Sequence, residues 1–219
     1  MHNTQYSCIM SNNMYSYQDL EKDIMDKVEE IVNQGITMTE PGSINYLLYG
    51  SVPSRQATSI KMGTVGEILI KKIIDHSSKL ELLQCGVHCI DPSTGKKKDL
   101  DLLWKNEEKK VIYYREAKGN IDLDSEKLPA TIEKINEILN TYIVEKYPDY
   151  TIDIGVLNWS IYDRDILKKG LSNIKKCEAK NVKVEHMGDI LKLLEFEWTS
   201  EQYTHFFRTV GNRFNVMFS

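Results

Sequence analysis

Apolar side chains recur every three or four residues between residues 16 and 35, the pattern of a helix that buries one face. The residues on that face are Leu20, Ile24, Val28, Ile31 and Val32. Ser16 and Asp19 have the spacing of a capping box at its start, and Gly35 is suited to its end. Residues 36–53 contain Pro41-Gly42, which predicts a connector with room for one short helix.

A second helix is predicted over residues 54–75. Its expected buried positions are Ile60, Val65, Ile68, Leu69, Ile73 and Ile74. Gly63 and Gly66 each cost such a helix about 1 kcal/mol relative to alanine, so a close approach by a strand or by DNA backbone should compensate.

Runs of β-branched, aromatic and aliphatic residues predict three strands after this helix. They cover residues 80–90, 97–104 and 110–118. The polar stretch between the last two strands predicts an antiparallel hairpin that turns at Asn106 and Glu107. An amphipathic helix ending near residue 147 and an apolar strand over residues 151–160 complete the order α-β-β-β-α-β.

The remaining residues, 161–219, predict further α/β structure. A short strand is expected at residues 182–184 and a short helix at residues 189–196. Thr199 and Gln202 form the pattern of a capping box, which predicts a last helix with Tyr203 and Phe206 in the core. Together with the N-terminal helix, this gives an N-terminal part (1–53), a central core (54–160) and a C-terminal extension (161–219), folded as one compact domain overall.

The hairpin carries the most informative side chains of the chain. If Asn106 and Glu107 are the turn centre, residues whose numbers sum to 213 lie opposite each other, and odd numbers pair with even. Asp99 and Asp101 then share one side of the hairpin with Glu116 and Lys118. Three carboxylates and an ammonium on one face of an apolar hairpin are costly to bury without a function.

These residue types fit the cleavage of phosphodiester bonds with a divalent metal. Carboxylates from adjacent strands are hard oxygen ligands for Mg²⁺, which shares its coordination sphere with water and substrate phosphate. A bound metal lowers the pKa of its water and neutralises charge on the phosphate. On a strand, a lysine two residues after a ligating carboxylate lies on the same face as that carboxylate. It can therefore orient or deprotonate the attacking water.

Asp101, a spacer of about fifteen residues and then Glu116-Ala117-Lys118 resemble the signature of the PD-(D/E)xK nuclease superfamily, and within it the type II restriction endonucleases. Leu100 stands where the literal motif has proline, which weakens the motif more than the assignment. The choice of metal-binding aspartate stays open. The resemblance favours Asp101, whereas the predicted register places Asp99 nearer to Glu116, unless a bulge or a longer turn shifts the strands.

The resemblance implies a restriction-endonuclease-like α/β (α+β) core with a mixed central sheet flanked by helices. It implies Mg²⁺, with Mn²⁺ as a substitute, held by Asp101 and Glu116 with support from Asp99 and Glu67, and Lys118 as the residue that positions water. It also implies cleavage of double-stranded DNA at a short sequence, a homodimer and a companion methyltransferase. Other nucleases of this superfamily, for repair or for junction resolution, and a non-catalytic DNA-binding protein on the same scaffold are the alternatives.

A net charge of −4 gives the chain no overall attraction to nucleic acid, so a nuclease must localise its basic residues. The candidate DNA-contacting residues are Arg55, Gln56, Lys61, Lys168, Lys169, Lys175, Lys176, Arg208 and Arg213. Helix N-termini favour anions, which supports Arg55 and Gln56. For the lysines, a solvated lysine-rich face is an equally simple interpretation.

Other function classes find little support in the sequence. No G-x-S-x-G or P-loop motif occurs. Cys85, His88 and Cys89 have the spacing of half a zinc site without a second half, so we expect reduced thiols instead. With no basic segment followed by an apolar one at the N-terminus and no run of roughly 18 apolar residues, we expect a cytoplasmic protein without membrane contact.

Overall fold

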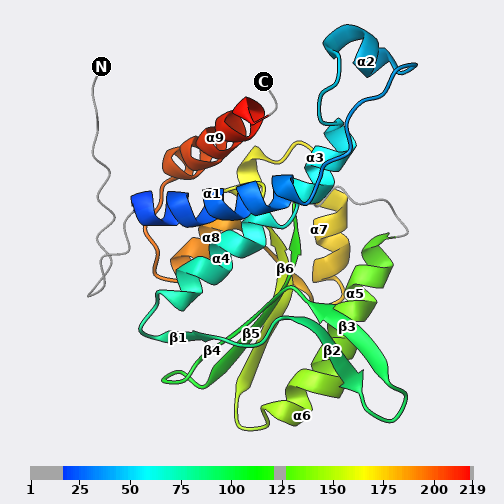
Figure 1. Ribbon diagram of the computed structural model, residues 1–219. Helices are drawn as coiled ribbons and strands as arrows, with labels where there is room; N and C mark the ends of the chain where they lie inside the picture. The colour runs from blue at the N-terminus through cyan, green and yellow to red at the C-terminus, as the bar shows by residue number, and fades with distance from the viewer. Residues whose placement is uncertain (1–16, 121–126, 218–219) are drawn as a thin grey trace. The chain divides into compact units, whose positions relative to one another are not determined.

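The computed structural model describes residues 17–120 and 127–217 and shows a mixed α/β fold (Figure 1). A five-stranded mixed sheet is flanked by helices, with the strand order β1-β4-β5-β6-β7. The chain divides into two compact units, Met1–Leu69 with Glu197–Ser219, and Ile70–Phe196. The sheet lies entirely within the second unit.

Strand β5 (Val111–Lys118) is the centre of this sheet. It pairs antiparallel with β4 (Leu102–Asn106), which pairs antiparallel with β1 (Leu80–Leu82). On its other side β5 pairs in parallel with β6 (Thr151–Asn158), and β6 pairs in parallel with β7 (Lys183–His186). All residues from Ile112 to Ala117 are buried, as expected for a strand that is covered on both faces.

Two predicted strands are each divided in the structure. Residues 80–90 form β1 and β2 (Gly86–Asp91), separated before Gly86, whose φ of 92° turns the chain. Residues 97–104 form β3 (Lys96–Leu100) and β4, separated at Asp101. Strands β2 and β3 pair with each other in a two-stranded sheet of their own.

The register of the hairpin differs from the predicted one. Asn106 pairs with Val111 and Leu102 with Arg115, so paired residue numbers sum to 217 and the predicted sum of 213 was wrong. The turn is longer because residues 107–110 all belong to it and Lys110 adopts a left-handed conformation with φ 51°. The Asn106 side chain stabilises this turn by accepting a hydrogen bond from the Lys109 N–H at 2.8 Å.

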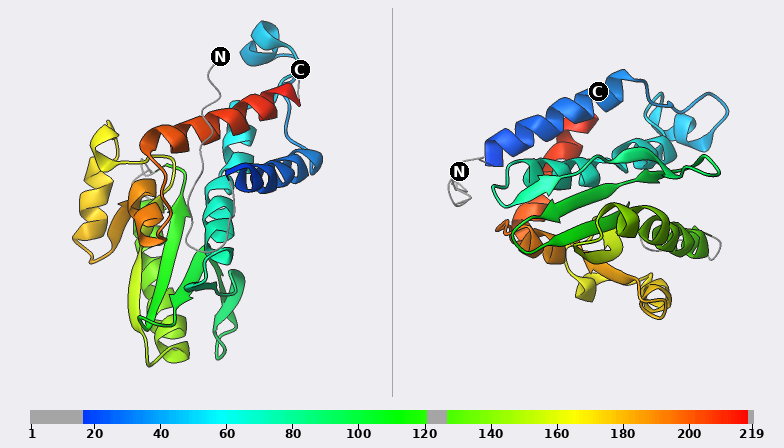
Figure 2. Two further views of the ribbon diagram at one scale, coloured as in Figure 1. Left: turned by 90° about the vertical axis from the view of Figure 1, so that its left-hand side faces the viewer. Right: turned by 90° about the horizontal axis from the view of Figure 1, so that it is seen from below.

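Two helices cover the sheet face that carries Tyr114 (Figure 2). Helix α5 (Lys127–Ile138) runs on through a π-helical segment (Leu139–Ile143) into α6 (Val144–Lys146), and α7 (Leu171–Glu178) follows β6 and a 3₁₀ turn (Arg164–Ile166). Their buried residues join those of the sheet in one core, which includes Leu103, Ile112, Tyr114, Leu128, Ile135, Ile138, Val156, Ile174 and Val184. Helix α8 (Met187–Leu193) follows β7 directly.

The other unit is helical. Helix α1 (Tyr17–Asn33) confirms the first predicted helix, with Leu20, Ile24 and Val28 buried but Ile31 and Val32 only half-buried, and the predicted cap residue Ser16 lies outside the described residues. Helix α9 (Ser200–Val216) confirms the last, because both capping-box hydrogen bonds between Thr199 and Gln202 form. A short helix, α2 (Ile44–Tyr49), lies in the predicted connector.

The single helix predicted over residues 54–75 was wrong. The structure has α3 (Arg55–Met62) and α4 (Val65–Asp75), with Gly63 as the C-cap of α3. A glycine is suited to this break because a Cβ there would lie 3.1 Å from the Ile60 carbonyl oxygen. Ile60, expected to be buried, is 67% exposed. Among the helices of the described residues, none is long and apolar enough to cross a membrane.

Candidate active site

Asp101 and Glu116 approach each other where β4 leaves β3. The observed register runs from Asn106–Val111 to Leu102–Arg115, and one further step places Asp101 opposite Glu116. Beyond the last backbone pair of β4 and β5, the Asp101 side chain takes the place of a backbone acceptor. Its Oδ2 accepts a hydrogen bond from the Ala117 N–H at 2.8 Å. The longer turn thus decides between the two aspartates, and Asp101 is the one beside Glu116.

The Glu116 carboxylate is surrounded by donors. Lys118 Nζ lies 2.8 Å from its Oε1, and Lys134 Nζ lies 2.6 Å from its Oε2. The Tyr114 hydroxyl donates to the same Oε2 at 3.0 Å. The Glu116 side chain is only 4% exposed, so these hydrogen bonds replace the water that the charge has lost.

Asp101 and Glu116 differ in their electrostatics although both are largely buried. Burial and, after it, the negative charge of Glu116 raise the pKa of Asp101 to about 6. Burial acts in the same direction on Glu116, but the ammonium groups of Lys118 and Lys134 outweigh it and lower the pKa of Glu116. Two carboxylates in one buried place, one of them destabilised as an anion, form a site that a cation would stabilise.

Lys134 is a member of the site that sequence reasoning missed. Its ammonium also lies 3.6 Å from Asp101 Oδ1, and its side chain is 19% exposed. Burial opposes its charge, yet Glu116 and Asp101 raise the pKa of Lys134. A signal was present in the sequence, because Lys134 follows the buried Thr131 by three residues and precedes the buried Ile138 by four, on the core-facing side of α5.

The other predicted metal ligands lie on other elements of the chain. Asp99 is an exposed residue of β3, paired with Val87, and it adds to the potential that raises the pKa of Lys134. Glu67 lies in the first turn of α4 and belongs to the helical unit. Asp122 and Asp124, two further carboxylates that follow Lys118 in the sequence, fall outside the described residues.

The candidate DNA-contacting residues are spread over several elements. Lys168, Lys169, Lys175 and Lys176 are exposed before and within α7. Gln56 and Lys61 lie on α3, and Arg208 and Arg213 are exposed on α9, where Arg213 forms an ion pair with Glu21 at 2.9 Å. The side chain of Arg55 is outside the described set.

A divalent metal would have few protein ligands here. Within residues 17–120 and 127–217, no group of three or more His, Cys, Asp or Glu side chains is placed to hold a metal ion, and this includes Cys85, His88 and Cys89. The carboxylates of Asp101 and Glu116 nevertheless fit Mg²⁺, which binds through one or two carboxylates and completes its shell with water and phosphate. They provide hard oxygen donors from two neighbouring segments of the chain.

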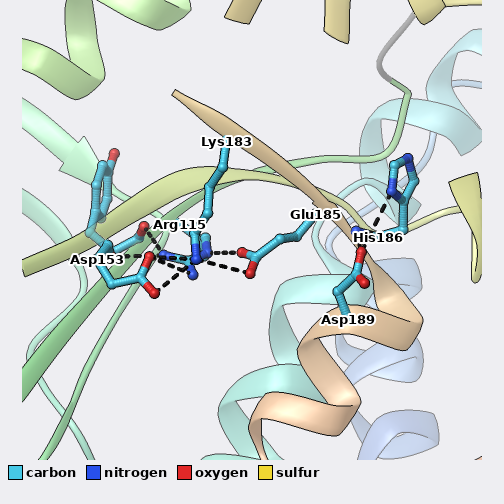
Figure 3. Close-up of polar contacts among 7 residues, drawn as sticks. Arg115, Asp153, Lys183, Glu185, His186 and Asp189 are labelled. Atoms are coloured by element: carbon cyan, nitrogen blue, oxygen red, sulfur yellow. Dashed lines mark hydrogen bonds and ion pairs between the residues drawn. The ribbon is translucent and has the colours of Figure 1, made fainter. Parts of the chain in front are cut away.

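The opposite face of the sheet carries a second polar cluster (Figure 3). Arg115, fully buried, forms ion pairs with Asp153 at 3.0 Å and with Glu185, and it donates to the Asp153 carbonyl at 2.7 Å. Lys183 Nζ lies 2.6 Å from Asp153 and 3.0 Å from Glu185. Every charge of this cluster has an opposite partner, so it supports the sheet and offers no free ligand group.

Known proteins give no further guidance about this site. No protein-family model matches the chain, and no curated protein matches it significantly.

Proposed function

We propose that this protein is a Mg²⁺-dependent nuclease of the PD-(D/E)xK superfamily, a type II restriction endonuclease that cleaves double-stranded DNA at a short sequence. The carrying observation is the approach of Asp101 to Glu116 with Lys118 hydrogen-bonded to that glutamate. The motif spacing alone recurs by chance in many proteins. The approach of its acidic members across neighbouring strands is what a metal site requires.

The order of the elements supports the same assignment. If the separate β2–β3 hairpin between β1 and β4 is set aside, helix α4, strands β1, β4 and β5, helix α5 and strand β6 give the order α-β-β-β-α-β. This is the order that the resemblance implies for a restriction-endonuclease-like core, with the acidic residues on the second and third strands. Agreement between a motif and its structural context is stronger support than either alone.

Asp101, directly before β4, and Glu116, on β5, would hold the metal through their carboxylate oxygens. When bound, Mg²⁺ would supply a water of lowered pKa and neutralise charge that develops on the phosphate. Lys118 lies on the same face of β5 as Glu116 and is 24% exposed, so its ammonium can reach both Glu116 and a water near the phosphate. Burial of Glu116 keeps bulk water from competing for these donors.

The same proposal includes double-stranded DNA as the partner and a homodimer as the acting form, because a two-fold symmetric protein matches a palindromic site. The candidate phosphate contacts on this acidic protein are the exposed lysines that precede α7 or lie on it, Lys168, Lys169, Lys175 and Lys176. Such contacts position the duplex and leave the reading of bases to other side chains.

Plasmid or phage DNA incubated with the purified protein in Mg²⁺ or EDTA tests the proposal. Wild-type protein should give discrete bands in Mg²⁺ only, and Asp101→Ala and Lys118→Ala should give none. Lys192→Ala on α8, which removes an exposed lysine, is the matched control and should cut normally. A smear of DNA fragments on the gel would indicate an unspecific nuclease in place of a restriction enzyme. Intact DNA in the presence of folded protein would refute nuclease function.

A further inference from the structure

The ammonium of Lys134 lies between the two carboxylates of the candidate active site. Its Nζ is 2.6 Å from Glu116 Oε2 on β5 and 3.6 Å from Oδ1 of Asp101, the residue directly before β4. A cation that bridged Asp101 and Glu116 would need oxygens from both carboxylates. Lys134 therefore stands where such a cation would bind.

The lone pairs of Glu116 support this interpretation. A carboxylate oxygen offers about two acceptor positions, and Oε2 already accepts from Lys134 and from the Tyr114 hydroxyl. Oε1 accepts from Lys118. Metal coordination through Oε2 requires that one donor leaves, and Lys134 is the one that also carries a positive charge opposing the metal.

The charges of the site lead to the same conclusion. Asp101 and Glu116 are balanced by Lys118 and Lys134, so the four side chains together are neutral when all are ionised. A divalent cation added to this set leaves an excess of positive charge. Repulsion then acts most strongly on the ammonium of Lys134, which lies between the two carboxylates, and a phosphodiester is the anion that restores the balance.

We propose that Lys134 fills the metal position in the metal-free protein, and that on metal binding it turns outward to contact a phosphate of the nucleic acid. The inference rests on the proposed function for its ligand class, a divalent cation followed by a phosphodiester. Lysine suits this exchange because its ammonium is a point charge on a flexible four-carbon stem. At 19% exposure the Lys134 side chain already borders solvent.

Metal titration without nucleic acid tests the first half of the exchange. Mn²⁺ binding is measured by calorimetry for wild type, Lys134→Met and Lys192→Met, each checked for folding by circular dichroism. Removal of a competing ammonium should tighten Mn²⁺ binding by about tenfold or more, whereas Lys192→Met, which removes an exposed lysine of α8, should match wild type. Equal or weaker binding by folded Lys134→Met would overturn the inference.

A measurement on the unaltered chain covers the case in which Lys134→Met does not fold. Lysines of the wild-type protein are acetylated with and without Mn²⁺, and each site is quantified by mass spectrometry. Lys134 should react faster in Mn²⁺ because its ion pairs with Glu116 and Asp101 are broken, while Lys192 serves as the internal reference. An unchanged Lys134 rate at saturating Mn²⁺ would overturn the exchange.

Binding of a short DNA duplex tests the second half. Fluorescence anisotropy in Ca²⁺, another hard cation with oxygen ligands, should show a loss of affinity in Lys134→Met that is absent in EDTA. A loss of equal size in both conditions would overturn the metal-linked contact. If the protein cleaves plasmid in Mg²⁺ but the acetylation rate of Lys134 does not change, this inference alone is refuted. If the protein neither binds Mn²⁺ nor cleaves DNA, the proposed nuclease function is refuted as well.

Discussion

The carboxylate of Asp101 accepts a hydrogen bond from the backbone N–H of Ala117 at 2.8 Å, directly after Glu116 on the neighbouring strand. This hydrogen bond attaches the bend between β3 and β4 to β5, the strand that carries Glu116. The two acidic groups are thereby held together before any metal is present. Asp101 and Glu116 should respond to pH in opposite directions, because burial and the charge of Glu116 raise the pKa of Asp101 whereas Lys118 and Lys134 lower the pKa of Glu116.

Replacement of Asp101 by Asn should stabilise the metal-free protein at neutral pH. The pKa of Asp101 is about 6 in the folded state and 3.8 as its ordinary value, so its ionised form is disfavoured by folding. Its contribution to stability is complete below pH 3.8 and is lost as the pH rises through about 6. The free energy of unfolding of Asp101→Asn should therefore exceed that of wild type by about 3 kcal/mol at pH 7.5 in EDTA, and by little at pH 4.

Urea unfolding of both proteins across this pH range measures the difference. The amide oxygen of Asn can still accept from the Ala117 N–H, which keeps the backbone contact in the variant. Asp101→Ala, which lacks that acceptor, separates the hydrogen bond from the charge and should be the less stable of the two variants. A wild type that is more stable than Asp101→Asn at pH 7.5 would contradict the electrostatic argument.

Replacement of Glu116 by Gln should have the opposite sign. Lys118 and Lys134 lower the pKa of Glu116 against the effect of burial, so its contribution to stability exists above pH 4.5 and is lost as the pH falls through the lower folded pKa. Glu116→Gln removes the counter-charge of Lys118 and leaves Lys134 with only the more distant Asp101, which should cost about 3 kcal/mol at pH 7. The cost should shrink towards pH 3.

Thermal or urea unfolding at pH 7 and pH 3 gives this comparison. Glu145→Gln on α6 makes the same chemical change at an exposed position and should alter stability by less than about 0.5 kcal/mol. If Glu116→Gln were as neutral as that control, the two lysines would not depend on Glu116 for their burial.

The elements that could be predicted from the sequence are those with local signals. The periodic stripe of α1 and the capping box at Thr199 are contained in a few neighbouring residues, and both proved correct. The resemblance also indicated Asp101 as the partner of Glu116, which the position of the two side chains supports. Periodicity cannot detect a short interruption, which is why the breaks at Gly63 and Asp101 were missed.

The register and Lys134 could not be derived in this way. The register depends on Lys110 in a left-handed conformation, which few non-glycine residues adopt. The role of Lys134 depends on how α5 docks against β5, a contact between segments distant in sequence. A lysine on the core-facing side of an amphipathic helix was a visible anomaly, but the sequence alone does not identify the carboxylate that it meets.

Replacement of Arg115 by Met should destabilise the sheet strongly. The Arg115 guanidinium is fully buried, and its loss leaves Asp153 and Glu185 with only Lys183 as counter-charge. Removal of one partner from a buried ion pair costs about 3–5 kcal/mol. Lys183→Met, which removes a 41% exposed ammonium from the same two carboxylates, should cost less than about 1 kcal/mol in urea unfolding.

The order of these two effects is the informative result. Equal losses would mean that Lys183 carries as much of the network as Arg115, although it is far better solvated. A small loss for Arg115→Met would mean that Asp153 and Glu185 regain water through a rearrangement of β6 and β7.

Replacement of Gly155 by Ala should also destabilise the protein, for a steric reason. A Cβ on Gly155 in β6 would lie 2.8 Å from both Cγ and the carbonyl oxygen of Lys183 on β7. The carbonyl cannot move without disturbing the pairing of the two parallel strands, so we expect a loss of about 1–3 kcal/mol. Gly211→Ala, in a helical site with nothing within 4 Å, should instead stabilise α9 by about 1 kcal/mol. Thermal unfolding of both variants checks the opposite signs, and a neutral Gly155→Ala would mean that β7 is free to shift away from β6.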